Sequence, residues 1–438
     1  MRRMSWIAIA FMLFAIPLWA QQQVKSPAAS DQADNAALMQ KIRDLENRII
    51  AMEGQIRQLK GQPATGQSAA IQKADVQAAV TTSPQTAVAS TPSQATAASN
   101  APASEAITVG GAGASASKAL NPDISVIGDF IGVAGHNPVQ YSPSLQMHES
   151  EVGLQAILDP YARGDVFLSF GESGVNLEEG YITFTALPAG FVARAGKMRS
   201  AFGKVNTLHN HALPWVDRPL VTNNLAGGED GINDAGLSIQ RILPAPKGIF
   251  LEATGQLFRG DSADVFTAST KSDVSAVAHL RTYKDITEST NLDFGLSYAR
   301  GHNDLGSNFL TQLYGIDSTV RWKPLRRSIY HSFALRSEFI WSQRQQLPFE
   351  RRAFGFYTSV DYQLGRRWFV GGRYDRSDRD RLARTTDTGG SIVLTYWPSE
   401  FSQVRGQYRF TRYEGNIDTH ELLMQVQFSL GAHGAHPF

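Results

Sequence analysis

The chain has 438 residues and a formal net charge of +1 at pH 7, and it contains no cysteine. The near-neutral charge gives no indication of a nucleic-acid partner, and the lack of cysteine excludes disulfide scaffolds, thiolate metal sites, thiol nucleophiles and lipoprotein acylation. The mean hydropathy of −0.23 does not exclude a transmembrane barrel, because a polar interior weakens the hydropathy signal of such a protein.

Residues 1–20 have the pattern of a secretory signal peptide. Arg2 and Arg3 supply the positive start, and residues 6–16 form an apolar stretch too short to span a membrane as a helix. Cleavage is expected after Ala20, and an uncleaved anchor is the alternative. Because no other stretch reaches the ~18 apolar residues of a membrane helix, a membrane protein with this sequence must be a closed β-barrel.

Residues 33–61 predict a coiled-coil helix. Apolar residues recur at alternating spacings of four and three, which is the period of a left-handed supercoil: Leu38, Ile42, Leu45, Ile49, Met52, Ile56 and Leu59. Isoleucine at a with Leu or Met at d favours a dimer. Residues 48–53, however, resemble the R-h-x-x-h-E motif of short trimeric coiled coils. We therefore expect a homotrimer, with a dimer as the alternative.

Residues 62–120 are rich in Ala, Ser, Thr, Gln and Pro and contain almost no bulky apolar residue. Such a segment cannot bury enough surface to offset its ordering entropy, so we expect a disordered linker. It offers no material for a folded plug domain.

Residues 121–438 predict an all-β domain, because apolar and polar residues alternate with period two, as in 292–298 and 422–430. About sixteen strands are expected, and their predicted ranges are 122–134, 146–157, 161–171, 176–187, 190–199, 233–243, 247–258, 272–284, 288–300, 309–323, 328–343, 350–364, 366–377, 388–398, 400–412 and 418–430.

Connection lengths distinguish a barrel from a β-sandwich, which would produce the same alternation. Connections after even-numbered strands are tight, as at 159–160, 323–325 and 364–365, whereas those after odd-numbered strands are often longer, as at 200–232 and 259–271. Short turns at one rim and longer loops at the other are typical of outer-membrane barrels, with the turns in the periplasm. The sequence therefore predicts a transmembrane antiparallel β-barrel in the outer membrane, with its N-terminal region in the periplasm.

This barrel resembles bacterial outer-membrane porins, nearest to the phosphate-selective porin O/P type. In general porins the third outer loop folds into the lumen and forms the constriction. The corresponding connection here carries charges suited to that role: Lys204, His209, His211, Asp217, Arg218, Glu229 and Asp230. The resemblance implies no cofactor. It implies as partners the bilayer and lipopolysaccharide of the outer membrane, the barrel-assembly machinery, for which the terminal Phe438 resembles the signal, and peptidoglycan.

Six arginines fall on the polar face of their predicted strands and would line the lumen: Arg281, Arg321, Arg336, Arg373, Arg405 and Arg409. This array resembles the arginine ladder of anion-selective porins, and guanidinium groups bind phosphate or carboxylate without titrating. The alternative is that these arginines pair with inward acidic residues and brace the wall: Asp293, Asp317, Glu338, Asp361 and Asp375.

The histidines raise a metal hypothesis. His209 and His211 could ligate a divalent ion together with a carboxylate such as Asp217, and His433 and His436 form a second pair near the end of the chain. Because such short spacings are common by chance, we assign no metal site from the sequence.

Three functions compete at this point. A passive diffusion channel for small hydrophilic solutes or ions, with a preference for anions such as phosphate, is favoured. A structural or adhesive barrel that grips the cell wall through its coiled coil is the second. A secreted all-β enzyme is the third, although no hydrolase, metalloprotease, P-loop or dinucleotide-binding motif occurs in the sequence.

Overall fold

The computed structural model describes residues 122–172, 174–262, 264–381 and 385–431. The predicted signal peptide, coiled coil and linker lie outside these residues, as do His433, His436 and Phe438. No helix in the described part of the chain is long and apolar enough to cross a membrane.

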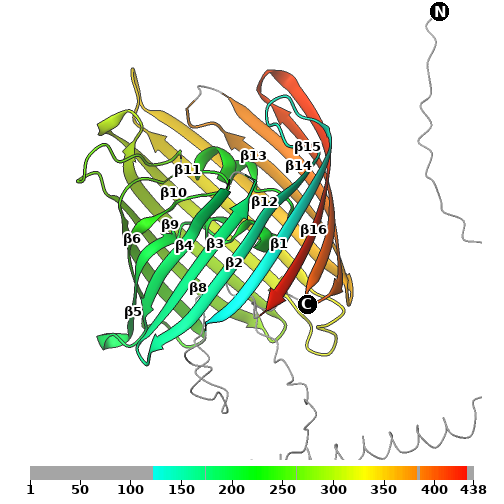
Figure 1. Ribbon diagram of the computed structural model, residues 1–438, viewed down its shortest axis with the longest axis horizontal. Coiled ribbons are helices and arrows are strands. Elements are labelled where there is room, and N and C mark those ends of the chain that lie inside the picture. The colour runs from blue at the N-terminus through cyan, green and yellow to red at the C-terminus, as the bar shows by residue number, and fades with distance from the viewer. Residues whose placement is uncertain (1–121, 173, 263, 382–384, 432–438) are drawn as a thin grey trace, which may run out of the picture. The chain divides into compact units, whose positions relative to one another are not determined.

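The described residues form sixteen antiparallel strands that close into one barrel, in which β1 pairs with β16 (Figure 1). Closure leaves no free sheet edge, so the ladders satisfy the backbone polar groups of the wall. The strands are β1 (Asp123–His136), β2 (Leu145–Asp159), β3 (Ala162–Gly171), β4 (Gly174–Phe184), β5 (Phe191–Arg199), β6 (Asn233–Ile242), β7 (Ile249–Phe258), β8 (Ser275–Thr287), β9 (Thr290–Asn303), β10 (Gly306–Trp322), β11 (Phe333–Arg344), β12 (Arg351–Gly365), β13 (Trp368–Asp378), β14 (Thr386–Ser399), β15 (Ser402–Tyr413) and β16 (Ile417–Gly431).

The number of strands and their antiparallel order confirm the prediction. The largest error in a strand boundary is at β11, which was expected to begin at residue 328 after a tight turn at 323–325 but begins at Phe333. Residues 324–331 fold into successive turns, in which Arg327 N donates to Pro324 O (3.2 Å) and Tyr330 N donates to Arg327 O (2.9 Å). These bonds engage backbone groups that a strand would offer to its neighbours.

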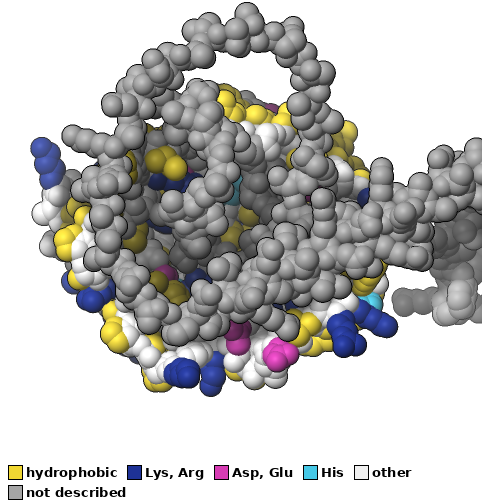
Figure 2. Space-filling view, turned by 90° about the horizontal axis from the view of Figure 1, so that it is seen from below, with side chains coloured by type: hydrophobic (Ala, Val, Ile, Leu, Met, Phe, Trp, Pro, Cys, Tyr) yellow, Lys and Arg dark blue, Asp and Glu magenta, His cyan; other side chains and the backbone are white. Residues whose placement is uncertain are grey.

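Two kinds of side chain separate across the wall. Outward-facing Leu237 and Ile392 are 63% and 65% exposed, whereas inward-facing Asp293 and Gln407 are 1% and 0% exposed. This arrangement inverts that of a soluble protein, because the apolar face is the outer one. Hydrophobic side chains cover parts of the outer wall, and Lys and Arg side chains project near the rim (Figure 2). An apolar outer band with a polar interior is typical of barrels that face lipid.

Aromatic side chains form two levels on the outer face. Trp322 and Phe333 are cross-strand neighbours near one rim, and Tyr314 lies between Trp341 and Tyr298 at the other level. Tyr314 and Trp322 belong to the same strand and are separated by roughly 26 Å along its tilted axis, at ~3.3 Å per residue. With a strand tilt of ~40°, the two levels are roughly 20 Å apart along the barrel axis, which is the order of the ~25 Å apolar band between the aromatic girdles of outer-membrane barrels.

The two rims differ in their connections. At the rim where the described chain begins and ends, turns such as 366–367 and 400–401 are short. The opposite rim carries the longest described connection, residues 200–232, which we name L3. L3 contains three short helices, η2 (Val205–Thr207), η3 (Asn210–Ala212) and α3 (Leu220–Leu225). Two further turns are helical, η1 (Pro188–Gly190) and η4 (Glu414–Asn416).

Candidate functional site

L3 folds into the barrel and packs an apolar core against the inward face. Its side chains Phe202, Trp215 and Val221 are at most 1% exposed. They belong to a buried cluster with inward residues of the wall, which include Val277, Ala299, Leu313, Ile340, Ala353, Tyr357 and Val393. Burial of this much apolar surface makes L3 a fixed part of the structure rather than a mobile surface loop.

Small residues allow L3 to approach the wall closely. The ring of Phe202 lies over Gly315 of β10, where an added Cβ would be 3.2 Å from Phe202 Cζ. Gly203 has φ +61°, and a Cβ there would collide with the Glu338 carboxylate. Gly203 N also donates to Ser297 Oγ of β9 at 2.9 Å. Position 203 therefore requires glycine for both its backbone conformation and its contact with β11.

Lys204 joins this deep part of L3 to the wall. Its Nζ lies 2.7 Å from Asp293 Oδ2, and Arg281 donates two bonds of 2.9 Å to the same carboxylate. Burial lowers the pKa of Lys204 to about 8, against the opposing effect of Asp293. One acidic side chain of β9 thus holds two cations, one from the wall and one from L3.

Arg321 and Arg336 lie near this group. Both side chains face inward and are half-buried, and Thr319 of β10 pairs with Arg336 of β11, which makes the two arginines diagonal neighbours. Arg336 forms an ion pair with Asp361. In the described part of the chain, Arg321 has no ion pair or hydrogen bond from its side chain.

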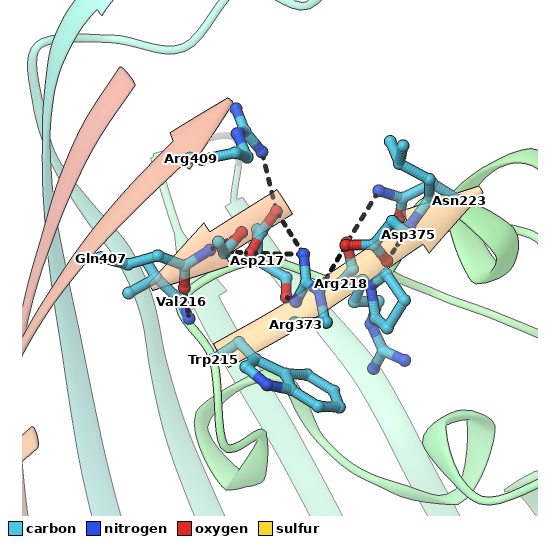
Figure 3. A network of polar contacts seen from close by, with 12 residues as sticks. Trp215, Val216, Asp217, Arg218, Asn223, Arg373, Asp375, Gln407 and Arg409 are labelled. Carbon is cyan, nitrogen blue, oxygen red and sulfur yellow. Dashed lines mark hydrogen bonds and ion pairs between the residues drawn. The ribbon is translucent and has the colours of Figure 1, made fainter. Parts of the chain in front are cut away.

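Asp217 connects L3 to the inward faces of β13 and β15 (Figure 3). Its Oδ2 lies 3.0 Å from Arg373 Nη2 of β13 and 2.9 Å from Arg409 Nη1 of β15. The two arginines also contact wall carboxylates, Asp375 at 2.7 Å and Glu421 at 2.5 Å respectively. Asp217 is therefore held in a network of charged groups. The sequence-based hypothesis that Asp217 could ligate a metal together with His209 and His211 is wrong.

Arg405 and Arg218 bind backbone oxygens of L3. Arg405 Nη1 donates to Leu213 O at 3.0 Å and to Trp215 O at 3.1 Å. Arg218 donates to Val205 O at 3.1 Å and to Leu208 O at 2.7 Å, and burial lowers its pKa to about 9. The N–H groups of both arginines therefore bind L3, so Arg405 and Arg218 are not free to bind a solute at these groups.

His209 and His211 face a group of glutamates on β2 and β4. His209 Nδ1 lies 2.6 Å from Glu151 Oε2, and His209 Nε2 lies 2.8 Å from Glu179 Oε2. Burial by itself would lower the pKa of His209, but its contacts with Glu151, Glu178 and Glu179 outweigh burial and hold the pKa well above its usual value. Burial lowers the pKa of His211.

Glu229 and Asp230 lie at the end of L3, and both are exposed. Glu229 Oε1 is 3.5 Å from His148 Nε2, while the backbone oxygens of both residues accept bonds from Arg199 Nη1. No ion pair joins either side chain to another predicted residue of L3 among the described residues, although Glu229 lies close enough to Arg218 for each charge to shift the pKa of the other group.

The structure shows which inward arginines pair with acidic residues of the wall. It also places four glutamates beside L3 that were not predicted from the sequence. Arg281, Arg336 and Arg373 pair with wall carboxylates in the way the bracing alternative required. The glutamates around His209 were not predicted: Glu149, Glu151, Glu178 and Glu179. The alternation could have indicated Glu149 and Glu151, which share one face of a predicted strand, but nothing local indicated their proximity to L3.

Comparison with known proteins identifies the fold of the barrel. No protein-family model matches the chain. An uncharacterized protein of Aquifex aeolicus (strain VF5) is 26% identical, with 73% of this chain and 81% of that protein covered.

Two solved structures have a TM-score of 0.51 to this chain. One is a loop-deletion mutant of OmpT, an outer membrane protein of Vibrio cholerae, at 9% identity. The other is the anion-selective porin from Comamonas acidovorans, at 12% identity. In both cases 71% of this chain and 99% of the other are covered. The barrel therefore has the fold of outer-membrane porins.

Proposed function

We propose that this protein is an outer-membrane channel through which small hydrophilic solutes diffuse passively. The observation that carries the proposal is the closed sixteen-strand barrel of the described residues, which is apolar outside and polar inside. Such a wall is stable in lipid because its strands pair with one another around a closed ring, and a polar interior can hold water.

L3 would form the constriction of this channel. It contacts the inward faces of β9 and β11 through residues 203–205, and those of β13 and β15 through Asp217. A loop that is attached between β5 and β6 and reaches β13 and β15, about half of the ring of strands away, narrows the path. The charges beside the narrow region then set the field that an ion experiences.

The preference would be for anions, with phosphate as a candidate solute. The support comes from Arg321, which is half-buried on the inward face and lies close enough to Lys204 to lower the pKa of that lysine. Arg321 has no ion-pair partner among the described residues, and the nearby Asp293 carboxylate is already shared by Lys204 and Arg281. Arg405, Arg409 and Arg218 support the shape of the channel rather than its selectivity, since their donors hold L3.

The remaining parts of the proposal follow from the sequence. The signal peptide at 1–20 would direct export, the barrel-assembly machinery would insert the barrel, and its outer face would contact the bilayer and lipopolysaccharide. The coiled coil at 33–61 and the linker at 62–120 would lie in the periplasm, within reach of peptidoglycan, and the coiled coil would join three chains.

Conductance of the full-length protein in a planar bilayer tests the proposal. With a KCl gradient we expect ohmic conductance and a reversal potential that is shifted toward the equilibrium potential of chloride. Arg321→Gln should move the reversal potential toward cation preference, whereas the control Arg412→Gln should leave it unchanged, because Arg412 is exposed on the outer face and already pairs with Asp418. A folded protein without conductance would indicate a structural or adhesive barrel. A reversal potential that does not change in Arg321→Gln would indicate a general diffusion pore.

A further inference from the structure

A cluster of carboxylates and imidazoles lies where L3 meets β2 and β4. Glu149 and Glu151 of β2 and Glu178 of β4 are 6%, 3% and 5% exposed. Within each of two groups, Glu151 with the two histidines and Glu149 with Glu151 and Glu178, one potential ligand atom per residue lies within 4.8 Å of the others. The residues come from three separate segments of the chain, and Glu151 belongs to both groups.

The hydrogen bonding of this cluster is incomplete. His209 Nδ1 lies 2.6 Å from Glu151 Oε2 and 2.8 Å from Glu178 Oε2, yet one N–H can serve only one of these oxygens well. Neither oxygen of Glu149 has a hydrogen-bond partner, and Glu178 Oε2 and His211 Nδ1 are also without one. Buried carboxylates in this condition are costly unless a cation or a proton compensates them.

We propose that Glu151, His209 and His211, supported by Glu149 and Glu178, form a binding site for a divalent transition-metal ion such as Zn²⁺. Imidazole nitrogen and carboxylate oxygen are the ligand types that zinc accepts. The ion would add positive charge beside Glu149, whose two oxygens have no hydrogen-bond partner, and would link L3 directly to β2.

The distances require little rearrangement. Ligand atoms at ~2.1 Å from a tetrahedral zinc ion are roughly 3.4 Å from one another, and His211 Nδ1 lies 3.5 Å from Glu151 Oε2. His209 would release its proton, and its Nδ1 would separate from the nearest carboxylate oxygens by roughly 0.6–0.8 Å.

The backbone that presents the two histidines is already held in place. They flank Asn210, whose Oδ1 accepts a 2.8 Å bond from Arg218 Nε. A site whose ligands are positioned before the metal arrives loses less entropy on binding.

Zinc binding to the full-length protein in detergent tests the inference. After removal of metal with a chelator, bound Zn²⁺ per chain is measured by elemental analysis, and affinity is measured by titration calorimetry. We expect His211→Asn to lose one bound zinc ion per chain or to weaken its affinity at least tenfold. The matched control His331→Asn changes a histidine in the 323–332 turn and should keep wild-type binding.

Glu149→Gln separates a metal from a proton. If a proton on Glu149 satisfies the cluster, the amide copies the protonated acid and zinc binding does not change. If Glu149 supports the metal as a carboxylate, the amide weakens zinc binding. Wild-type zinc binding in both Glu149→Gln and His211→Asn would overturn the site, as would the absence of zinc binding by the wild-type protein.

Two further measurements show that the metal binds at this site and that the variant is folded. Co²⁺ bound at this site should give visible absorption bands that His211→Asn removes, and retained heat-modifiable migration in gels shows that the variant is folded. An affinity for Ca²⁺ equal to that for Zn²⁺ would contradict a role for the histidines. All of these readouts measure binding, so they stand or fall independently of whether the barrel conducts.

Discussion

Asp217 joins L3 to two strands through one carboxylate. It contacts Arg373 of β13 and Arg409 of β15 at 3.0 and 2.9 Å, and Arg373 also lies 4.8 Å from the centre of the Trp215 ring. Each arginine keeps a wall carboxylate of its own, Asp375 or Glu421. Removing Asp217 should therefore loosen L3 without leaving a cation wholly unpaired.

We predict that Asp217→Asn makes local opening of L3 easier by about 1.5–3 kcal/mol, the usual contribution of hydrogen bonds to charged groups. Hydrogen exchange of residues 213–225 should accelerate, while exchange in the strands stays unchanged. Asp418→Asn is the control, because it removes an exposed pair with Arg412 and should have little effect. Equal exchange of L3 in both variants would contradict the role assigned to Asp217.

The same residue determines how L3 responds to acid. Burial would raise the pKa of Asp217, but Arg373 and Arg409 outweigh burial and lower it to about 2. A depressed pKa in the folded protein gives stability that is present above the unfolded value, ~3.9, and is lost as pH falls through about 2. The Asp217 contact should consequently persist at pH 4.

At the scale of the strand, neighbouring residues face different solvents. Ile239 of β6 is 49% exposed on the outer face, whereas Gln240 faces inward and donates to Glu252 of β7 at 2.6 Å. These adjacent positions offer a matched test of which face contacts lipid.

We predict that Ile239→Arg impairs assembly, because an arginine on the lipid face of such barrels costs up to roughly 2–4 kcal/mol, depending on its depth in the bilayer. Gln240→Arg should assemble normally, because its guanidinium can pair with Glu252. The fraction of protein that acquires heat-modifiable migration in gels measures assembly. Similar yields for the two variants would mean that the outer face does not contact lipid.

Not every inward position would accept a large side chain. Ser297 of β9 lies on the polar face by alternation, yet it is 7% exposed and its Oγ accepts the backbone bond from Gly203. An arginine there would displace L3. Alternation indicates the direction of a side chain but not the presence of a loop above it.

At the scale of the whole molecule, we predict that the chain is a trimer held partly by residues 38–59. The heptads and the motif at 48–53 place Ile49 and Ile56 at the seam, so replacing both with Asp should abolish association of that segment. Sedimentation equilibrium of an isolated 30–62 peptide measures this directly, with the double variant as the comparison. A wild-type peptide that stays monomeric at high concentration would exclude the coiled coil as an association element.

The sequence by itself determined the number of strands, the faces of the strands and the position of the long connection. It could do so because the alternation of apolar and polar residues is a local property of each strand. A shift of one residue in register would move every side chain of a strand to the other face, so the alternation specifies which face each residue occupies. The same alternation placed Arg281, Arg373, Arg405 and Arg409 on the inward face, where the structure has them.

Only the tertiary structure decided what these side chains contact. Arg409 meets Asp217 across 192 positions of sequence, and Arg405 meets the carbonyl oxygen of Leu213 across another 192. Likewise, His209 meets Glu151 across 58 positions. Such contacts depend on the path of L3 through the interior, which is set by burial of its apolar residues against inward Leu313 and Ile340. The burial of loop residues follows no sequence period, so the path of L3 could not be predicted from the sequence and is known only from the tertiary structure.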